Sequence, residues 1–250
     1  MSGKRKVHEA RLAPGFSAII RQLERRSDPA AVAGMARFGI VAKKVYGVPM
    51  PELRALARRI GPDRALARRL WAHEALETRL LASMIDDPER VTAAQMERWV
   101  RDFDSWAICD GCCLNLFRWT PCAWRKAVEW AGRDGEFVRR AGFVLMATLA
   151  VGDQRAPDAD FQKLLPLIEK HSADQRNLVK KAVNWALRQI GKRNLGLRGK
   201  ALAAARRMRK LDSSAARWIA ADAIRELEGS AVVDRLRARA VALEKPRRGP

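Results

Sequence analysis

The sequence predicts an all-α fold, an α-solenoid of antiparallel helix pairs with a concave basic face. Apolar residues recur at i, i+3, i+4 and i+7 along nearly the whole chain, and no alternating strand pattern appears. The expected inner helices resemble one another, because each has a basic residue near its start and then an apolar stretch. Their spacing fits repeats of roughly 35–40 residues, which typically stack into curved HEAT-like arrays.

The helices are expected in a regular succession. In chain order they run near residues 50–60, 63–72, 75–86, 92–103, 105–118, 121–132, 135–151, 158–171, 175–193, 195–209, 213–228 and 230–244. Residues of capping type precede several of them: Thr92, Asp104 or Ser105, Thr120 before Pro121, Ser172, Ser213 and Ser230. Gly132, Gly152 and Gly229 lie near helix ends, where a left-handed residue is expected.

Composition indicates a single helical domain over 15–244, with loose ends at 1–14 and 245–250. The 250 residues are 48% hydrophobic, which excludes a disordered polymer and leaves enough chain to bury a core. We find neither a signal peptide nor an apolar run long enough to span a bilayer. The four cysteines lie close together and fit a reducing compartment. We therefore expect a cytoplasmic, nucleoid-associated monomer with no membrane partner.

The formal charge of +21 is concentrated near the C-terminus. Residues 176–250 hold 20 Lys and Arg against 6 Asp and Glu, so two thirds of the excess lies in the last third of the chain. Such charge favours phosphate binding through counterion release. An arginine-rich coding bias is the alternative, but it would not gather the charge in one region.

Trp106 and Asp110 are the most informative pair in the chain. Their i, i+4 spacing puts an aromatic ring and a carboxylate on one face of a helix, inside an apolar stretch. A buried carboxylate is costly unless it is paired or used. Taken singly, Trp106 could be a core residue, and Asp110 could be solvated or bonded to a helix end.

A metal site is not expected. Cys109, Cys112, Cys113 and Cys122 have no histidine near them, and their segment reads as a continuous helix. Small buried thiols explain them better than zinc does. No other cofactor is indicated.

Four local patterns resemble the HEAT-like bacterial DNA alkylation repair proteins of the alkylpurine DNA glycosylase D type. They occur in the family's order between about Met35 and Leu227, and they are Tyr46-Gly47-Val48-Pro49 with Pro51-Glu52-Leu53-Arg54, Asp104-Ser105-Trp106 to Asp110, Glu136 to Ala141, and Lys180-Lys181-Ala182 with Trp185 to Arg188. The resemblance implies a monofunctional glycosylase that hydrolyses the N-glycosidic bond of cationic N3- or N7-alkylated purines in duplex DNA. It also implies that the lesion is not drawn into a deep pocket.

The same resemblance implies the site residues. Trp106, Asp110 and Arg140 correspond to the catalytic set, and Trp185 corresponds to a second tryptophan of the cleft. Phe38 falls where the family has a cleft tyrosine. Further DNA contacts are expected from these basic residues: Arg54, Lys180, Lys181, Arg188, Lys192 and Arg193.

The residue types suit the chemistry. A cationic purine is already a good leaving group, so the demand lies at the sugar, where an oxocarbenium-like cation develops. Asp110 would stabilise that cation, the two tryptophans would wall the site, and Arg140 would grip a phosphate, with Arg139 as its rival. A non-catalytic module that binds damaged or branched DNA is the alternative function. A protein-binding solenoid is disfavoured by the charge.

Overall fold

The computed structural model describes residues 14–244, which divide into two compact units, up to Asp87 and from Pro88 onward. Apart from Pro14, the ends expected to be loose, 1–14 and 245–250, lie outside the described residues. The described part is all-α and contains one isolated β-bridge, between Lys44 and Ala75. The expected all-α fold class is thereby confirmed. That 15–244 act as a single domain stays a prediction.

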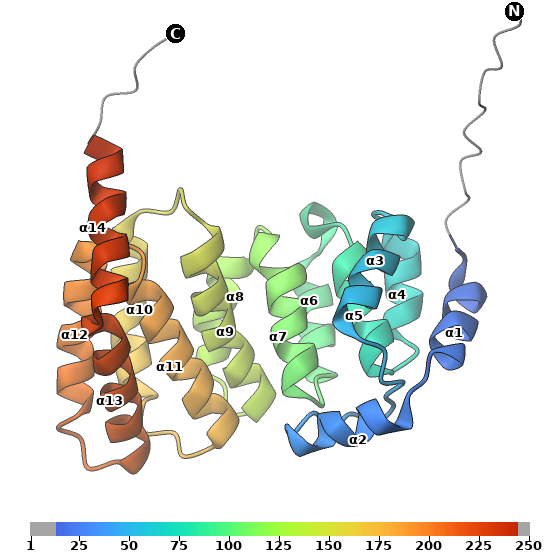
Figure 1. The fold of residues 1–250 in the computed structure, drawn as a ribbon, viewed down its shortest axis with the longest axis horizontal. Helices are drawn as coiled ribbons and strands as arrows, with labels where there is room; N and C mark the ends of the chain where they lie inside the picture. Colours follow the sequence, from blue (N-terminus) through green and yellow to red (C-terminus); the bar gives the residue numbers. More distant parts are fainter. Residues whose placement is uncertain (1–13, 245–250) are drawn as a thin grey trace, which may run out of the picture. The chain divides into compact units, whose positions relative to one another are not determined.

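The described part of the first unit, from residue 14 to Asp87, contains five helices, which are labelled in Figure 1. They are α1 (Phe16–Arg25), α2 (Pro29–Arg37), α3 (Met50–Ile60), α4 (Arg64–Trp71) and α5 (Leu76–Ile85). The helices predicted from the sequence begin only at residue 50, so α1 and α2 are additional. Asp28 caps α2 by accepting from the Ala30 and Ala31 amides. α5 packs against both α3 and α4 and is buried along nearly its whole length.

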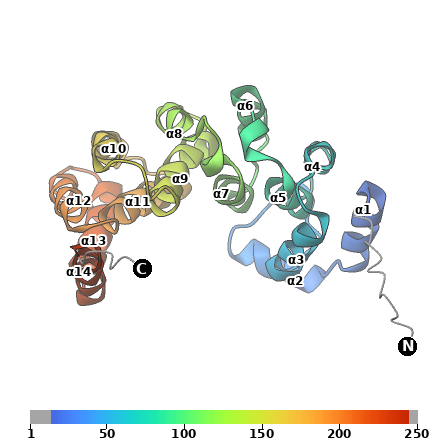
Figure 2. The same ribbon diagram turned by 90° about the horizontal axis from the view of Figure 1, so that it is seen from above.

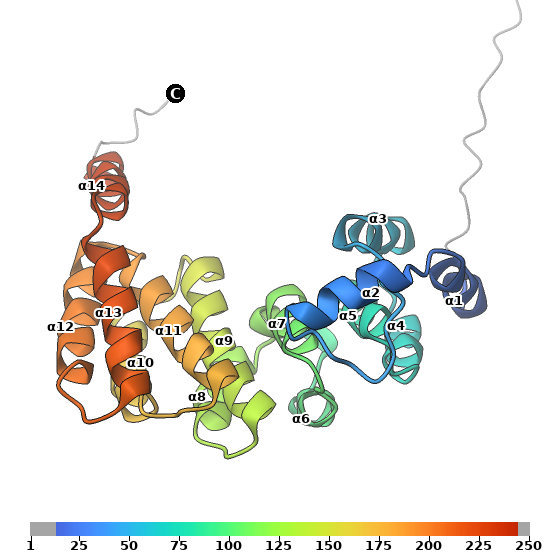
Figure 3. The same cartoon turned by 60° about the horizontal axis from the view of Figure 1, so that its bottom comes forward.

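The second unit stacks antiparallel helix pairs in two layers (Figure 2). Its elements are η1 (Pro88–Arg90), α6 (Ala93–Arg101), α7 (Trp106–Asn115), η2 (Phe117–Trp119), α8 (Ala123–Ala131), α9 (Glu136–Gly152), α10 (Asp158–Lys170), α11 (Asn177–Gly191), α12 (Leu195–Met208), α13 (Ser214–Glu228) and α14 (Ser230–Glu244). α11 packs between α9 and α13 in one layer (Figure 3). α8, α10 and α12 lie in the other layer, as Figure 2 shows. α9 is buried over most of its length because its residues from Arg140 to Ala150 are covered on both sides.

Glycine decides how closely two of these helices approach. A Cβ added to Gly142 of α9 would stand 2.3 Å from the Ala131 nitrogen and 2.9 Å from the Ala127 carbonyl oxygen of α8. Only a residue without a side chain lets the two backbones pack at this distance. The register of α9 against α8 is therefore set two residues beyond Arg140.

Several expected helix ends are wrong. The Thr92 and Ser213 caps are confirmed, but the Thr120 and Ser172 hydroxyls donate backward to the carbonyls of Phe117 and Glu169. α8 and α11 accordingly begin later than expected, at Ala123 and Asn177. Serine and threonine side chains can bond locally in either direction, and sequence does not say which.

The glycine expectation also fails. Gly132 and Gly229 have φ of −82° and −59°, and Gly152 is the last residue of α9. The left-handed glycines are Gly39, Gly47 and Gly61. The first unit thus holds all of the described left-handed glycines.

Candidate active site

Ser105 starts the helix that carries the site. Its hydroxyl accepts from the Ala107 amide at 3.3 Å, so α7 begins at Trp106 and Asp110 follows one turn later. Capping by a serine at this point satisfies one of the free amides of the first turn. The sequence signal for the cap, read as Asp104 or Ser105, resolves to Ser105.

Two buried thiols hold α7 against α9. Cys109 Sγ donates to the Phe137 carbonyl at 3.7 Å, and Cys113 Sγ donates to the Ala141 carbonyl at 3.8 Å. Burial raises the pKa of both thiols, so they are neutral donors. Because both partners are spaced i, i+4, the contacts align one turn of α7 with one turn of α9. Asp110 and Arg140 lie inside that aligned turn.

Arg140 grips Asp110 with a two-pronged ion pair. Arg140 Nε donates to Asp110 Oδ1 at 2.9 Å and Nη2 donates to Oδ2 at 2.7 Å, while Nη1 donates to the Leu178 carbonyl of α11 at 2.6 Å. The side chains of Arg140 and Asp110 are only 8% and 14% exposed. This single guanidinium therefore joins α7, α9 and α11.

Burial and pairing shift the pKa of the Asp110 carboxyl in opposite directions. Withdrawal from water raises the pKa of Asp110 above its ordinary value, and the Arg140 guanidinium opposes that rise. Burial acts to lower the pKa of Arg140, but Asp110 raises it overall. The pair is thus a carboxylate held by a permanently charged partner, with acceptor capacity on its free lone pairs.

Two tryptophans accompany the pair. Trp106 is half-buried, and the Arg140 guanidinium carbon lies 6.0 Å from the centre of its ring. Trp185 is also half-buried and follows Leu178 by seven residues, which is two turns along the same side of α11. When the Gln189 amide oxygen faces the indole, Trp185 Nε1 donates to it at 3.1 Å.

Arg139, the rival of Arg140, points elsewhere. It pairs with Asp174 at 2.8 Å and with Asp134 at 2.9 Å. These two acids lie in the loops before α11 and α9. Arg140 is therefore the arginine that meets Asp110.

The residues expected to contact DNA differ in their exposure and in whether they form ion pairs. Lys181 is exposed, and Lys180 Nζ lies 4.9 Å from the centre of the Trp218 ring. Arg188 and Lys192 both pair with Glu226, so that their charge is partly neutralised. Their contacts with phosphate stay predictions.

Arg193 is used structurally. Its guanidinium donates to the carbonyls of Ala150 and Asp153 at 2.7 and 2.9 Å and to that of Ala156 at 3.3 Å. Those carbonyls lie at the end of α9 and in the loop after it, where helix carbonyls lack partners.

Two expected site residues belong to the first unit. Phe38 follows α2 and is 78% exposed, and Arg54 is exposed on α3. Their predicted roles in DNA binding stay predictions. Basic residues at inner-helix starts do not all reach solvent, however, because Arg79 and Arg140 are buried.

Sequence reasoning missed the groups that assemble the site. The Leu178 carbonyl carries no residue-specific signal, and the sequence predicts only core packing for Cys109 and Cys113. Within the described residues, no group of three His, Cys, Asp or Glu side chains could hold a metal ion. No described helix has the length and apolar character of a membrane span.

Fold and site together define an all-α, HEAT-like protein with a tryptophan–carboxylate–arginine cluster. A family model for DNA alkylation repair enzymes matches residues 19–227, and the chain belongs to that family. No curated protein matches it. One similar solved structure is described as a new family of proteins related to the HEAT-like repeat DNA glycosylases, with affinity for branched DNA structures. It is 18% identical, covers 85% of this chain and 95% of its own, and superimposes with a TM-score of 0.71, which shows the shared fold.

Proposed function

We propose that the protein is a monofunctional DNA glycosylase that hydrolyses the N-glycosidic bond of cationic N3- or N7-alkylated purines in duplex DNA. The observation that carries the proposal is the Asp110 carboxylate, largely buried, clamped by Arg140 and placed one turn from Trp106. Membership of the DNA alkylation repair family supports the reaction class.

Cleavage of a cationic purine needs little help at the base. The electron pair of the C1′–N bond passes to the base, which leaves neutral, and positive charge develops on the sugar. A fixed carboxylate beside C1′ stabilises that charge without reorganising, and it can orient the water that adds to C1′. Asp110 has this position in the proposal, and its remaining exposure gives the sugar access to it.

The geometry supports a positioning role for Arg140, in place of the phosphate grip expected from the chemistry of its side chain. Three of its five N–H groups are spent on Asp110 and Leu178. A guanidinium so placed keeps Asp110 ionised and fixes the direction of its oxygens. Trp106 and Trp185 would contribute ring faces that attract the cationic lesion.

Release of methylated purine from alkylated duplex DNA tests the proposal. We expect Asp110→Asn and Trp106→Ala to release base at least about 100-fold more slowly than the wild-type protein, while both still bind duplex. Asp212→Asn is the matched control, because that side chain is fully exposed and, among the described residues, forms an ion pair only with Arg217. If Asp110→Asn releases base at the wild-type rate, the role assigned to Asp110 is wrong.

A second function has one observation in its favour. The similar solved structure is described as having affinity for branched DNA. If the protein only binds DNA, it will bind a four-way junction tightly and release no base from any alkylated substrate. The two candidates are separated by the base-release assay alone.

A further inference from the structure

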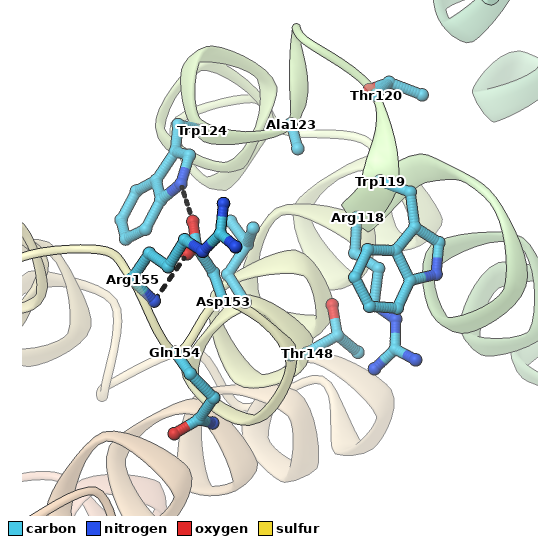
Figure 4. A pocket seen from close by; sticks show the side chains of 11 residues that line it. Arg118, Trp119, Thr120, Ala123, Trp124, Thr148, Asp153, Gln154 and Arg155 are labelled. Atoms are coloured by element: carbon cyan, nitrogen blue, oxygen red, sulfur yellow. Dashed lines mark hydrogen bonds between the residues drawn. The ribbon is translucent and has the colours of Figure 1, made fainter. Parts of the chain in front are cut away.

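A cavity of about 420 Å³ lies at the C-terminal end of α9 (Figure 4). It is walled by η2, the start of α8 and the loop that follows α9, and its side chains include Arg118, Trp119, Trp124, Asp153 and Arg155. Arg140 and Gly152 are twelve residues apart on α9, so this cavity lies about 18 Å along the helix from the Asp110 clamp. Its volume is within the range of small-ligand sites.

Arg118 brings an uncompensated charge to this cavity. Among the described residues it forms no ion pair, its Nε is buried without an acceptor, and burial lowers the pKa of its guanidinium. Arg118 is partly withdrawn from water, and a cation so placed without a counter-ion loses part of its hydration. An anionic ligand bound beside Arg118 would offset that loss, so this charge favours an anion in the cavity.

Trp119 offers an aromatic surface beside that charge. It is 50% exposed, and the Arg118 guanidinium carbon lies 4.3 Å from the centre of its ring. A Cβ on Gly152 would stand 3.3 Å from Arg118 Nη1 and 3.6 Å from Trp119 Cη2, so both side chains rest on the last turn of α9. A half-exposed indole held in place by backbone is a stacking platform for a flat ring.

The carboxylate in the cavity wall, Asp153, already accepts hydrogen bonds on both oxygens. Asp153 Oδ2 accepts from Trp124 Nε1 at 3.1 Å, and Oδ1 accepts from the Arg155 and Ala156 amides at 3.2 and 3.0 Å. The exposed Arg155 side chain adds a second positive charge to the wall. Two arginines, Arg118 and Arg155, stand against the one carboxylate of Asp153, so the lining has a net positive charge and favours a ligand that is both aromatic and anionic.

Further cations continue from this cavity. Gln154 also lines a smaller cavity of about 170 Å³, whose wall includes Arg235 and Arg239, one turn apart on α14. Lys192 and Arg193 line it as well. A chain of phosphates leaving the first cavity would meet this second group of cations.

We propose that the first cavity binds one unpaired nucleotide of single-stranded DNA, with its base stacked on Trp119 and a phosphate on Arg118. Flanking phosphates then run over Arg235 and Arg239. This site goes beyond base release, because it requires no lesion and does not use Asp110.

Binding of an unmodified, fluorescein-labelled oligodeoxythymidine of about eight nucleotides, followed by anisotropy, tests the site. Trp119→Ala is expected to weaken binding about tenfold or more, and Trp119→Phe, which keeps a ring, to stay within about threefold of wild type. An abasic strand of equal length has the same phosphates and no bases. It should bind the wild-type protein and Trp119→Ala equally. Loss of less than twofold with Trp119→Ala on the oligodeoxythymidine would overturn the proposal.

A charge-matched pair tests the phosphate contact. Arg118→Gln and Arg125→Gln each remove one positive charge, but Arg125 is exposed on α8 and does not line the cavity. The proposed site predicts about a tenfold loss for Arg118→Gln and less than twofold for Arg125→Gln. Equal losses would reduce the binding to general electrostatics and overturn the proposal. Tighter binding of the matching RNA strand than of DNA would overturn the assignment to DNA. Because the probe carries no lesion, these outcomes are independent of base release.

Discussion

Two buried carboxylates, Glu77 in the first unit and Asp110 in the second, show how similar residues serve different ends. Glu77 is fully buried, and its oxygens accept from three backbone amides, those of Tyr46, Gly47 and Val48, at 2.7–3.3 Å. Asp110 is held by one side chain and keeps 14% of its surface exposed next to Trp106. Burial of an acid is common to both, so burial alone does not indicate chemistry. What points to chemistry at Asp110 is that one side of its carboxylate remains open to a ligand.

The comparison also explains one family pattern. Tyr46-Gly47-Val48-Pro49 is the loop that Glu77 clamps, and Gly47 has a φ of +82°. A Cβ on Gly47 would stand 2.5 Å from the Asp28 carbonyl oxygen. This stretch therefore has a structural explanation and needs no contact with DNA.

The largest expected effect breaks the Glu77 clamp. Glu77→Ala leaves three buried amides without acceptors, which should lower the free energy of unfolding by about 3–6 kcal/mol. Urea unfolding measures this loss. Glu52→Gln is the control, since Glu52 is 44% exposed in a weak pair with Arg26, and it should change stability by less than about 0.5 kcal/mol. Similar losses in the two variants would contradict the clamp.

A glycine substitution tests how α9 is positioned. Gly142→Ala should destabilise the protein by about 2–3 kcal/mol and slow base release, because α9 must move away from α8 and shift Arg140 relative to Asp110. Gly199→Ala is the matched control on α12. Nothing lies within 4 Å of its Cβ position, so alanine should stabilise the helix by up to about 1 kcal/mol. Thermal unfolding of both variants measures these changes in stability. If Gly142→Ala leaves the stability unchanged, close packing at this contact is contradicted.

The arginine of the clamp should set the acid limb of the pH profile. Burial raises the pKa of Asp110 and Arg140 opposes it, so Arg140→Gln should raise that pKa further. Base release needs the carboxylate, and it should then fall off at a higher pH than in the wild-type protein, with a rate loss of about tenfold or more at neutral pH. Arg139→Gln should leave the profile in place. Coincident profiles for wild type and Arg140→Gln would show that Arg140 does not act through Asp110.

A third carboxylate, Glu97, is held by several donors, and its contribution to stability can be measured as a function of pH. Burial opposes its ionisation, but Lys126, Trp130 and Arg133 donate to it and lower its pKa to about 2. A group with a depressed pKa in the folded state stabilises the protein above its unfolded value near 4.5, and that contribution is lost as pH falls toward 2. Glu97→Gln should remove about 2–3 kcal/mol at neutral pH and flatten this acid loss, as followed by urea unfolding at each pH. An unchanged slope would contradict the shift.

The helices expected from residue 50 onward are present, because apolar residues recur at helical spacing along most of them. Their ends are less well predicted. Ser105 and Ser213 cap forward, whereas Thr120 and Ser172 bond backward. The competing bonds are nearly equal in energy, and the surrounding packing selects between them.

The candidate site divides in the same way. Sequence by itself determined the class of fold, the one-turn spacing of Trp106 and Asp110, and the choice of arginines at 139 and 140, because these follow from helical period and residue type. Only the tertiary structure decided that Arg140 meets Asp110 while Arg139 turns to Asp174, and that the Leu178 carbonyl completes the clamp. The physical reason is that neighbouring residues on a helix point about 100° apart. The register of α7 against α9, which the thiol contacts set, selects which of them enters the site.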